Sequence, residues 1–316
     1  MSALHEPLTV ETALVTGHLD VVTVAVCLVV LAGYWWGWRR STVSVGRGVA
    51  FSVLGVGIWV ASASSFVGAY ADILFWVRAL QVVLLLLVVP FGLASGMPMT
   101  VLRDGLGASG RRRFDAVLAS RFARVLTYPA VASGFILVTP WLFYLTGWYE
   151  AVLRGTAVDV GTRLLFVAVG FLYFYSRLQL DPVPRRFPQV ISLVITIVET
   201  IGDGALGVVI WQGHDIAHGY YAALERTWGP ALRTDQIIGA GVLWVLGDVV
   251  GLPFLLTLMS RFTSDEKVRA TEIDAELDAA AAAAAPSGTE QIDAAEPAPP
   301  ALWWEADPRL KDRFIR

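Results

Sequence analysis

The chain of 316 residues is strongly apolar: 56% of its residues are hydrophobic, 16% are charged, and its mean hydropathy is +0.61. Soluble proteins carry about 25% charged residues, so this composition excludes an ordinary soluble domain and indicates an integral membrane protein. The net charge of -3 averages an acidic tail with basic loops and points to no nucleic-acid partner. The single cysteine, Cys27, excludes an intrachain disulfide and any metal site that needs two thiolates.

About seven apolar runs are long enough to cross a bilayer, since a spanning helix needs ~20 apolar residues. They are Leu19–Trp38, Gly48–Val67, Leu74–Leu102, Val125–Gly147, Leu164–Leu180, Val190–Trp211 and Ile237–Met259. We expect Pro90 and Pro98 to kink the long third run. The segment before the first run has no basic stretch, so we expect no cleavable signal peptide. The prediction is an all-α bundle of about seven transmembrane helices at residues 19–262, after an extracellular segment at residues 1–18.

Basic residues set the expected orientation. Arginines and lysines gather in the loops after the first, third, fifth and seventh runs. The alternate loops carry only Arg154, Arg163, Arg226 and Arg233. Because basic loops stay in the cytoplasm, we expect a multi-pass protein of the plasma membrane with its N-terminus outside and its C-terminus in the cytoplasm.

Residues 263–316 differ in composition from the apolar runs. Ser264 to Asp278 is charged and is expected to continue the last helix into the cytoplasm, whereas the Ala/Pro/Glu-rich stretch that follows cannot bury a core and is expected to be disordered. Trp303 and Trp304 lie beside basic residues near the end. Docking of this end on a membrane or partner and a freely mobile tail both remain open.

Two carboxylates, Glu199 and Asp203, lie within the sixth apolar run. A charge at the centre of a membrane helix costs about 2.5–3.5 kcal/mol on insertion scales, so it is rarely without a role. The two side chains share one helical face, one turn apart, and like charges so placed repel. One of them is therefore protonated, or a cation lies nearby. A functional polar site and a structural salt bridge both account for this pattern.

Two further charges lie at membrane depth: Arg78 in the third run and Asp248 in the seventh. Along the helix rise, Arg78 reaches the level of Asp203 because its long side chain can extend toward the interface. We therefore predict an Arg78–Asp203 ion pair, with Glu199 or Asp248 as second partners. Together these four residues form a predicted intramembrane charge cluster.

Three histidines are candidate metal ligands. His214 and His218 have i, i+4 spacing beside Asp215, just after the sixth run, and His18 precedes the first run. Solvated loop histidines explain the same pattern. The seventh run holds no lysine, which excludes a retinal Schiff base. Motifs of the P-loop, GxSxG, HExxH and CxxC types are absent, so the sequence predicts a protein that is not an enzyme.

Several loops resemble those of one membrane-protein family. LDPVPRRFP at Leu180–Pro188, and GYYAALERTWGP with TDQIIGAGVLWVLGD within Gly219–Asp248, resemble the corresponding segments of CtaG-type cytochrome c oxidase assembly factors. Shorter matches occur in order at Gly17–Asp20, Tyr70–Phe75, Leu126–Pro129 and Trp148–Gly155. The positions that match the family's motifs are Gln81, Pro129, Asp181, Pro184, Arg185, Asp235, Gln236 and Trp244. The resemblance extends from Leu8 to about Asp278.

This resemblance implies a role in assembling haem–copper oxidases, and copper is the one cofactor that it implies. The family's histidines, however, are replaced at most positions. Arg78, Val82, Tyr128, Asp203 and a position near Leu165 stand where relatives carry histidine, and His18 alone is kept. Because arginine stays protonated, it cannot ligate copper, and a salt bridge is expected to replace the metal-bridged histidines.

Two functions follow from these observations. The first is a non-enzymatic assembly or maturation factor that binds cytochrome c oxidase subunits or assembly intermediates within the lipid bilayer, with a link to copper delivery through the resemblance. The alternative is a proton- or cation-coupled transporter that uses Glu199, Asp203 and Asp248 as a relay. The lack of an inverted repeat weakens the alternative.

Overall fold

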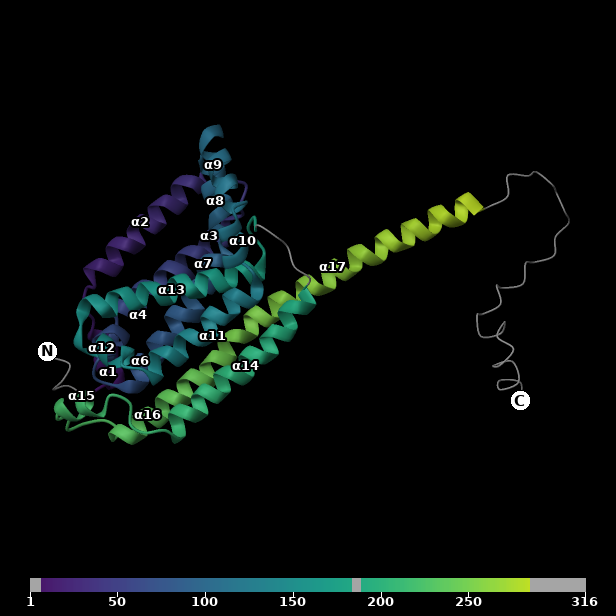
Figure 1. Cartoon of the computed structure of the whole chain (residues 1–316). Coiled ribbons are helices and arrows are strands. Elements are labelled where there is room, and N and C mark those ends of the chain that lie inside the picture. Colours follow the sequence, from purple (N-terminus) through teal and green to yellow (C-terminus); the bar gives the residue numbers. More distant parts are fainter. Residues whose placement is uncertain (1–6, 184–188, 285–316) are drawn as a thin grey trace, which may run out of the picture. The chain divides into compact units, whose positions relative to one another are not determined.

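The computed structural model describes residues 7–183 and 189–284, and throughout these residues the secondary structure is helical, with no strand (Figure 1). This confirms the all-α prediction. Pro184, Arg185 and the tail that holds Trp303 and Trp304 lie outside the described residues. By its internal contacts the chain divides into two compact units, Met1–Asp265 and Glu266–Arg316.

Five helical runs among the described residues are long and apolar enough to cross a membrane. They are Val21–Trp38 (α2), Val45–Ser64 (α3, η2 and α4), Phe75–Ser95 (α6, η3 and α7), Thr156–Leu178 (α13) and Ile195–Gln212, which lies in α14 (Gln189–Gln212). A sixth span results if α11 (Pro129–Leu145) and α12 (Trp148–Arg154), which are bent by 70° at their junction, count as one. Five of the predicted runs therefore coincide with helices of this kind, and Val125–Gly147 is the sixth if the bent pair counts as one span.

The predicted seventh run coincides with three consecutive helical elements. These are α16 (Leu232–Gly241), a π-helical turn η4 (Val242–Leu246) and the start of α17 (Gly247–Ala284). The helix α17 continues through the charged segment beyond the apolar run. The remaining helices are short: α1 (Val10–Val15), α5 (Phe66–Tyr70), α8 (Pro98–Gly105), α9 (Ala108–Leu118), α10 (Arg121–Leu126) and α15 (His218–Ala223).

The sequence predicted one long helix for the third apolar run, kinked at Pro90 and Pro98. In the structure the run instead divides into two helices at Met97. A π-helical turn, η3 (Leu84–Val88), precedes Pro90, and α7 (Val89–Ser95) then ends before Met97, whose φ of 54° is left-handed. Pro98 opens the separate helix α8. Proline has no amide hydrogen and fits the first turn of a helix, so the chain restarts at Pro98 instead of bending through it.

Small residues allow the helices to approach closely, as is common in membrane proteins. A Cβ on Gly170 of α13 would lie 2.1 Å from the carbonyl oxygen of Leu86 in η3. A Cβ on Gly92 of α7 would lie 2.4 Å from the amide nitrogen of Gly55 in η2 (Phe51–Gly57). These two contacts place α13 and η2 against the η3–α7 segment. The close packing fixes how α13 is rotated, and α13 carries several of the polar side chains described next.

Candidate functional site: a charge network and a carboxylate cavity

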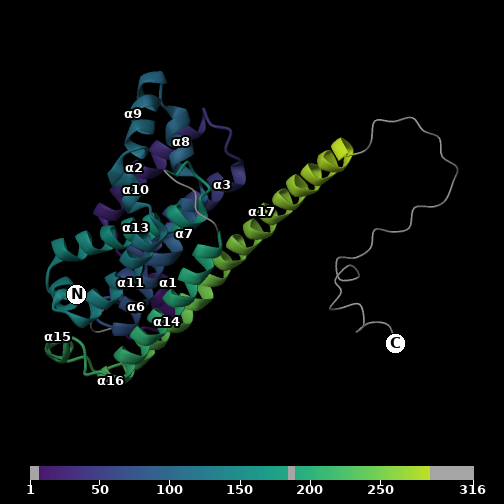
Figure 2. The ribbon, with the colours of Figure 1, turned by 45° about the vertical axis from the view of Figure 1, so that its right-hand side comes forward.

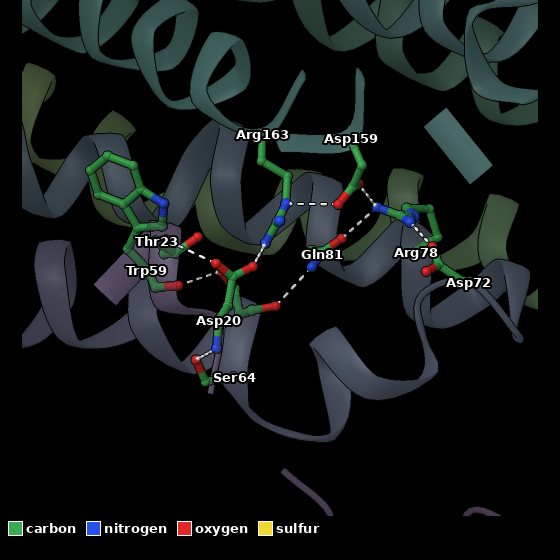
Figure 3. A network of polar contacts seen from close by, with 10 residues as sticks. Asp20, Thr23, Trp59, Ser64, Asp72, Arg78, Gln81, Asp159 and Arg163 are labelled. Atoms are coloured by element: carbon green, nitrogen blue, oxygen red, sulfur yellow. Dashed lines mark hydrogen bonds and ion pairs between the residues drawn. The ribbon is translucent and has the colours of Figure 1, made fainter. Parts of the chain in front are cut away.

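Arg78 lies in the first half of α6 (Phe75–Val83), and only 3% of its surface is exposed. Its guanidinium pairs with Asp72, which lies just before the helix, and its Nη1 is 2.7 Å from Oδ1 of Asp159. Nη1 also donates a hydrogen bond to Oε1 of Gln81 at 2.9 Å. A buried arginine is thus matched by two carboxylates and an amide, as Figure 3 shows.

The contacts continue from Asp159 to the start of α2. Nε of Arg163 is 3.0 Å from Oδ2 of Asp159, and Nη1 of Arg163 is 2.7 Å from Oδ2 of Asp20 (Figure 3). Asp20 also caps α2, because its Oδ1 accepts the amide hydrogen of Thr23 at 2.8 Å. Asp72, Arg78, Asp159, Arg163 and Asp20 therefore alternate in charge along one chain of contacts, which we call the charge network.

The two carboxylates of the network that lie outside the spans respond differently to this setting. Burial raises the pKa of Asp20, but the amide of Thr23 and the guanidinium of Arg163 outweigh it, so the pKa lies below its ordinary value. Burial raises the pKa of Asp72 above its ordinary value, and Arg78 offsets only part of that effect. The ionised network is therefore secured most firmly at its Asp20 end.

A cavity of about 200 Å³ lies against the charge network. His18 and Gln81 also line it, and Nε2 of Gln81 donates to the carbonyl of Ser62 at 2.8 Å. The His18 side chain is exposed, while its amide donates to the carbonyl of Ser64 at 3.0 Å. Two positions where the family resemblance places histidine, His18 and Arg78, thus meet at one cavity.

The predicted Arg78–Asp203 ion pair is wrong. Arg78 is neutralised by Asp72 and Asp159, and Asp203 lines a different cavity, to which Arg78 does not contribute. The physical reason is proximity: Asp72 and Asp159 lie at the starts of the helices that meet around Arg78, so its side chain does not need to extend to another level. The i, i+4 spacing of Asp159 and Arg163 was the available signal for this partner.

Glu199 is the centre of a second polar site. Its Oε2 accepts a hydrogen bond from the hydroxyl of Tyr173 at 2.8 Å, and its Oε1 is 3.3 Å from Nη1 of Arg177. Arg177 is fully buried and also donates to Ser133 at 3.0 Å and to Thr196 at 2.5 Å. The structural salt bridge, one of the two alternatives for Glu199, is present. Arg177 was not predicted as a partner of Glu199, because an arginine near the end of the fifth apolar run was expected to belong to the basic loop that follows it.

Glu199 and Asp203 line one small cavity of about 80 Å³ between the helices, which we call the carboxylate cavity. Apart from Tyr173, the other side chains around it are apolar, among them Val82 and Leu206. Asp248, at the start of α17, is exposed. The four predicted intramembrane charges therefore do not form one cluster: Arg78 belongs to the charge network, whereas Glu199 and Asp203 line the carboxylate cavity.

Two acidic motif residues cap helices that are distant in sequence. Asp235 of α16 accepts the amide hydrogens of Phe75 and Trp76 at 3.1 and 3.0 Å, at the start of α6. Asp181 accepts the amide hydrogens of Met99 and Thr100 at 3.2 and 2.8 Å, in the first turn of α8. The first amides of a helix have no partner within the helix, so these carboxylates satisfy donors that would otherwise be buried unpaired.

The remaining described motif residues have structural settings too. Gln236 accepts from the amide of Ile216 at 2.7 Å and donates to the carbonyls of Ile210 and His214 at 2.8 and 3.1 Å, which fixes the loop after α14. Pro129 is the first residue of α11. Trp244 lines a shallow apolar pocket between α14, α16 and η4.

The residues at hand do not fit a copper ion. Copper takes imidazole, thiolate or thioether ligands, whereas Arg78 is paired with carboxylates and Val82 has no donor atom. His218 lies 3.5 Å from Asp215, which also approaches Arg233 at 3.6 Å, so this carboxylate is engaged with two cationic or protonatable groups. Among the described residues no group of three or more His, Cys, Asp or Glu side chains is arranged to hold a metal, and this includes His18 and His214.

Comparison with known proteins finds relatives in three mycobacteria. The chain is 23% identical over 288 residues to uncharacterized proteins of Mycobacterium bovis and Mycobacterium tuberculosis, and these alignments cover 87% of this chain and 43% of each relative. An uncharacterized protein of Mycobacterium leprae is 23% identical over 269 residues, or 81% of this chain and 41% of the relative. The chain thus spans less than half the length of these relatives, and no solved structure matches it.

A family model described as cytochrome c oxidase caa3 assembly factor matches residues 31–265. The match includes Arg78, Asp159 and Arg163 of the charge network and all residues of the carboxylate cavity. The chain therefore belongs to the cytochrome c oxidase caa3 assembly factor (Caa3_CtaG) family.

Proposed function

We propose that the protein is a membrane-embedded assembly factor for cytochrome c oxidase, which acts by binding oxidase subunits or assembly intermediates and not by catalysis. Membership of the family over residues 31–265 is the observation that carries the proposal, because this range includes nearly the whole bundle. The apolar helices and the basic loops support a location in the plasma membrane, with seven spans, the N-terminus outside and the C-terminus in the cytoplasm.

We further propose that this chain acts without binding copper itself. The ion pairs of Arg78 with Asp72 and Asp159 connect the start of α6 to the start of α13. In relatives with histidine at this position, a metal ion could make such a connection. Such a network holds the helices in place but offers no ligand for metal transfer. We therefore propose that the protein acts as a scaffold, to whose surface oxidase subunits or assembly intermediates bind.

The transporter alternative has less support from the contacts. A relay needs carboxylates that exchange protons or cations, whereas Glu199 is bound by the guanidinium of Arg177 and the hydroxyl of Tyr173. Asp203 and Asp248 form no ion pair with an arginine or lysine among the described residues. A transport pathway, however, needs a series of such groups across the bundle, and only Glu199 and Asp203, of the acidic residues described, line the carboxylate cavity. The assembly role therefore stands as the single proposal.

Deletion of the gene in the native host tests it. We expect the membranes to lose the haem absorption and the turnover of the terminal oxidase, and wild-type protein supplied from a plasmid to restore both. A plasmid that carries His18→Ala should restore them equally, because the proposal assigns no copper to His18. A deletion strain with intact oxidase contradicts the assembly role. Stoichiometric copper in the purified protein contradicts only the copper-free mechanism.

A further inference from the structure

A short pattern occurs twice between α8 and α11. Residues Phe114–Leu118 read FDAVL and residues Phe122–Leu126 read FARVL. In each copy Phe, Val and Leu stand at i, i+3 and i+4, on one face of a helix. The first copy ends α9 and the second ends α10, so the chain presents the same apolar triad on two consecutive helices. We call residues 108–126 the basic arm.

Among the described residues, the bundle does not cover the apolar faces of the basic arm. Neither α9 nor α10 contains a buried residue. Val117 is 67% exposed, Phe122 76% and Val125 61%. Large apolar side chains that project together from two helices need an apolar environment, because their exposure to water is unfavourable.

The arginines of the arm separate into two groups. Arg111 is held in place, since it donates to the carbonyls of Arg103, Asp104 and Leu106 at 3.1, 2.8 and 3.0 Å. The others are exposed and make no hydrogen bond or ion pair with any described residue. These free arginines are Arg112, Arg113, Arg121 and Arg124.

The arm begins next to the end of the span α2 and is followed by α11. Before the arm, Gly105 at the end of α8 lies against Gly37 in the last turn of α2, where an added Cβ would be 2.9 Å from the Cα of Gly37. Arg40, just after α2, donates to the carbonyl of Gly105 at 3.2 Å. After the arm, α11 begins at Pro129. In Figures 1 and 2, α9 and α10 lie at the end of the bundle where α2 stops and α3 begins.

We propose that the basic arm lies in the headgroup layer of the protein's own membrane and binds anionic phospholipid. Val117, Phe122 and Val125 enter the boundary with the acyl chains, and the four free arginines bind lipid phosphate oxygens. Amphipathic helices with arginine beside Phe, Leu and Val bind membrane interfaces in this way, through apolar burial together with attraction to anionic lipid.

The position of the arm selects the bilayer over another protein as its occupant. An arm that follows α8, whose end packs against the end of α2, and that precedes α11 remains next to the headgroups throughout. Its free charge is of one sign only, which complements an anionic leaflet, and long arginine side chains can reach phosphates while their stems stay apolar. The bound lipid would hold this face of the assembly factor against the membrane.

The test places a fluorophore on the arm in the full-length protein. Ala119→Cys, made in a Cys27→Ala background, is labelled with an environment-sensitive dye and reconstituted into nanodiscs of phosphatidylcholine with or without phosphatidylglycerol. We expect phosphatidylglycerol to shift the emission to shorter wavelength and to reduce quenching by acrylamide, and high salt to reverse part of both effects. Arg121→Gln should lower the equilibrium between docked and free arm about fivefold.

Two variants make the result decisive. The combined replacement of the four free arginines by glutamine should abolish the response to phosphatidylglycerol, while Arg39→Gln, which removes one exposed guanidinium from the same end of the bundle outside the arm, should leave it unchanged. Equal emission with and without phosphatidylglycerol overturns the proposal. So does an emission shift on adding phosphatidylglycerol that persists in the variant with all four arginines replaced. An arm that instead docks on another protein gives the first of these outcomes, because the nanodiscs contain no other chain.

Discussion

At the scale of single residues, the protein places the charge of Arg78 where the family resemblance places histidine, and the buried charges Arg78 and Glu199 are both paired. Arg78 has two carboxylate partners, and Glu199 is paired with Arg177. Removing one partner from a buried pair is costly because the remaining charge stays desolvated. The charges are therefore expected to be structurally necessary, whether or not they take part in oxidase assembly.

Arg78 and Asp159 form the pair in which this necessity can be measured. Arg78→Ala should lower the free energy of unfolding in mixed detergent by about 3 kcal/mol, near the lower end for a buried pair because Asp159 keeps Arg163. Asp159→Asn should also destabilise, and the double variant should lose less than the sum of the two, by roughly 0.5–3 kcal/mol.

Asp203→Asn is the control for this cycle. Added to Arg78→Ala, it should contribute its own effect without coupling, because Asp203 lines the other cavity. Additive losses for Arg78 and Asp159 would show that the charge network does not act as a unit.

At the scale of elements, loops and distant helices fix where other helices begin. Asp235 satisfies amides at the start of α6, and Asp181 does the same for α8. Asp235 is separated from Phe75 by 160 residues in sequence. A cap supplied by another element holds the start of a helix next to that element. Asp235 and Asp181 therefore fix the positions of α6 and α8 relative to the segments that carry the two carboxylates.

Close packing of α13 against η3 gives a prediction at this scale. Gly170→Ala should destabilise the protein by about 1–3 kcal/mol, because the added methyl group meets the backbone carbonyl of Leu86 and the helices must separate. Gly161→Ala, in the same helix with no atom within 4 Å of its added Cβ, should be neutral or stabilising by up to about 1 kcal/mol. Thermal unfolding of the two variants in detergent compares them, and equal behaviour would contradict the close approach seen here.

At the scale of the whole molecule, the proposed orientation determines which surfaces meet the cytoplasm. In the proposed seven-span topology the basic arm follows the third span, and the segment that holds His214 and His218 follows the sixth. The two should therefore lie on opposite sides of the membrane. Only one side can then be reached by oxidase components in the cytoplasm.

Cysteine accessibility tests this orientation. In a Cys27→Ala background, Gly219→Cys in α15 should react with a membrane-impermeant maleimide in intact cells, because Gly219 is exposed and we expect its segment outside. Ala119→Cys should react only after the membrane is opened. Equal labelling of both positions in intact cells would refute the seven-span arrangement, and the reverse pattern would invert it.

The sequence by itself determined that the chain is all-α and rich in apolar helices. It located five runs that coincide with helices long and apolar enough to span a membrane, and a sixth if the bent pair α11 and α12 counts as one span. This was possible because the length of an apolar run is a local property that the thickness of the bilayer sets directly, and because a helix satisfies its backbone within one segment. The motifs of the family could likewise be recognised in the sequence, and the match of the family model to residues 31–265 confirms the resemblance.

Only the tertiary structure decided which charges pair. Arg78 and Asp159 are 81 residues apart, whereas Asp203, which the counting of residues predicted as the partner of Arg78, lines the other cavity. Depth follows from counting residues, but partnership depends on how each helix is rotated and which neighbours it touches. Close contacts such as Gly170 against Leu86 set that rotation, and no single helix sequence records them.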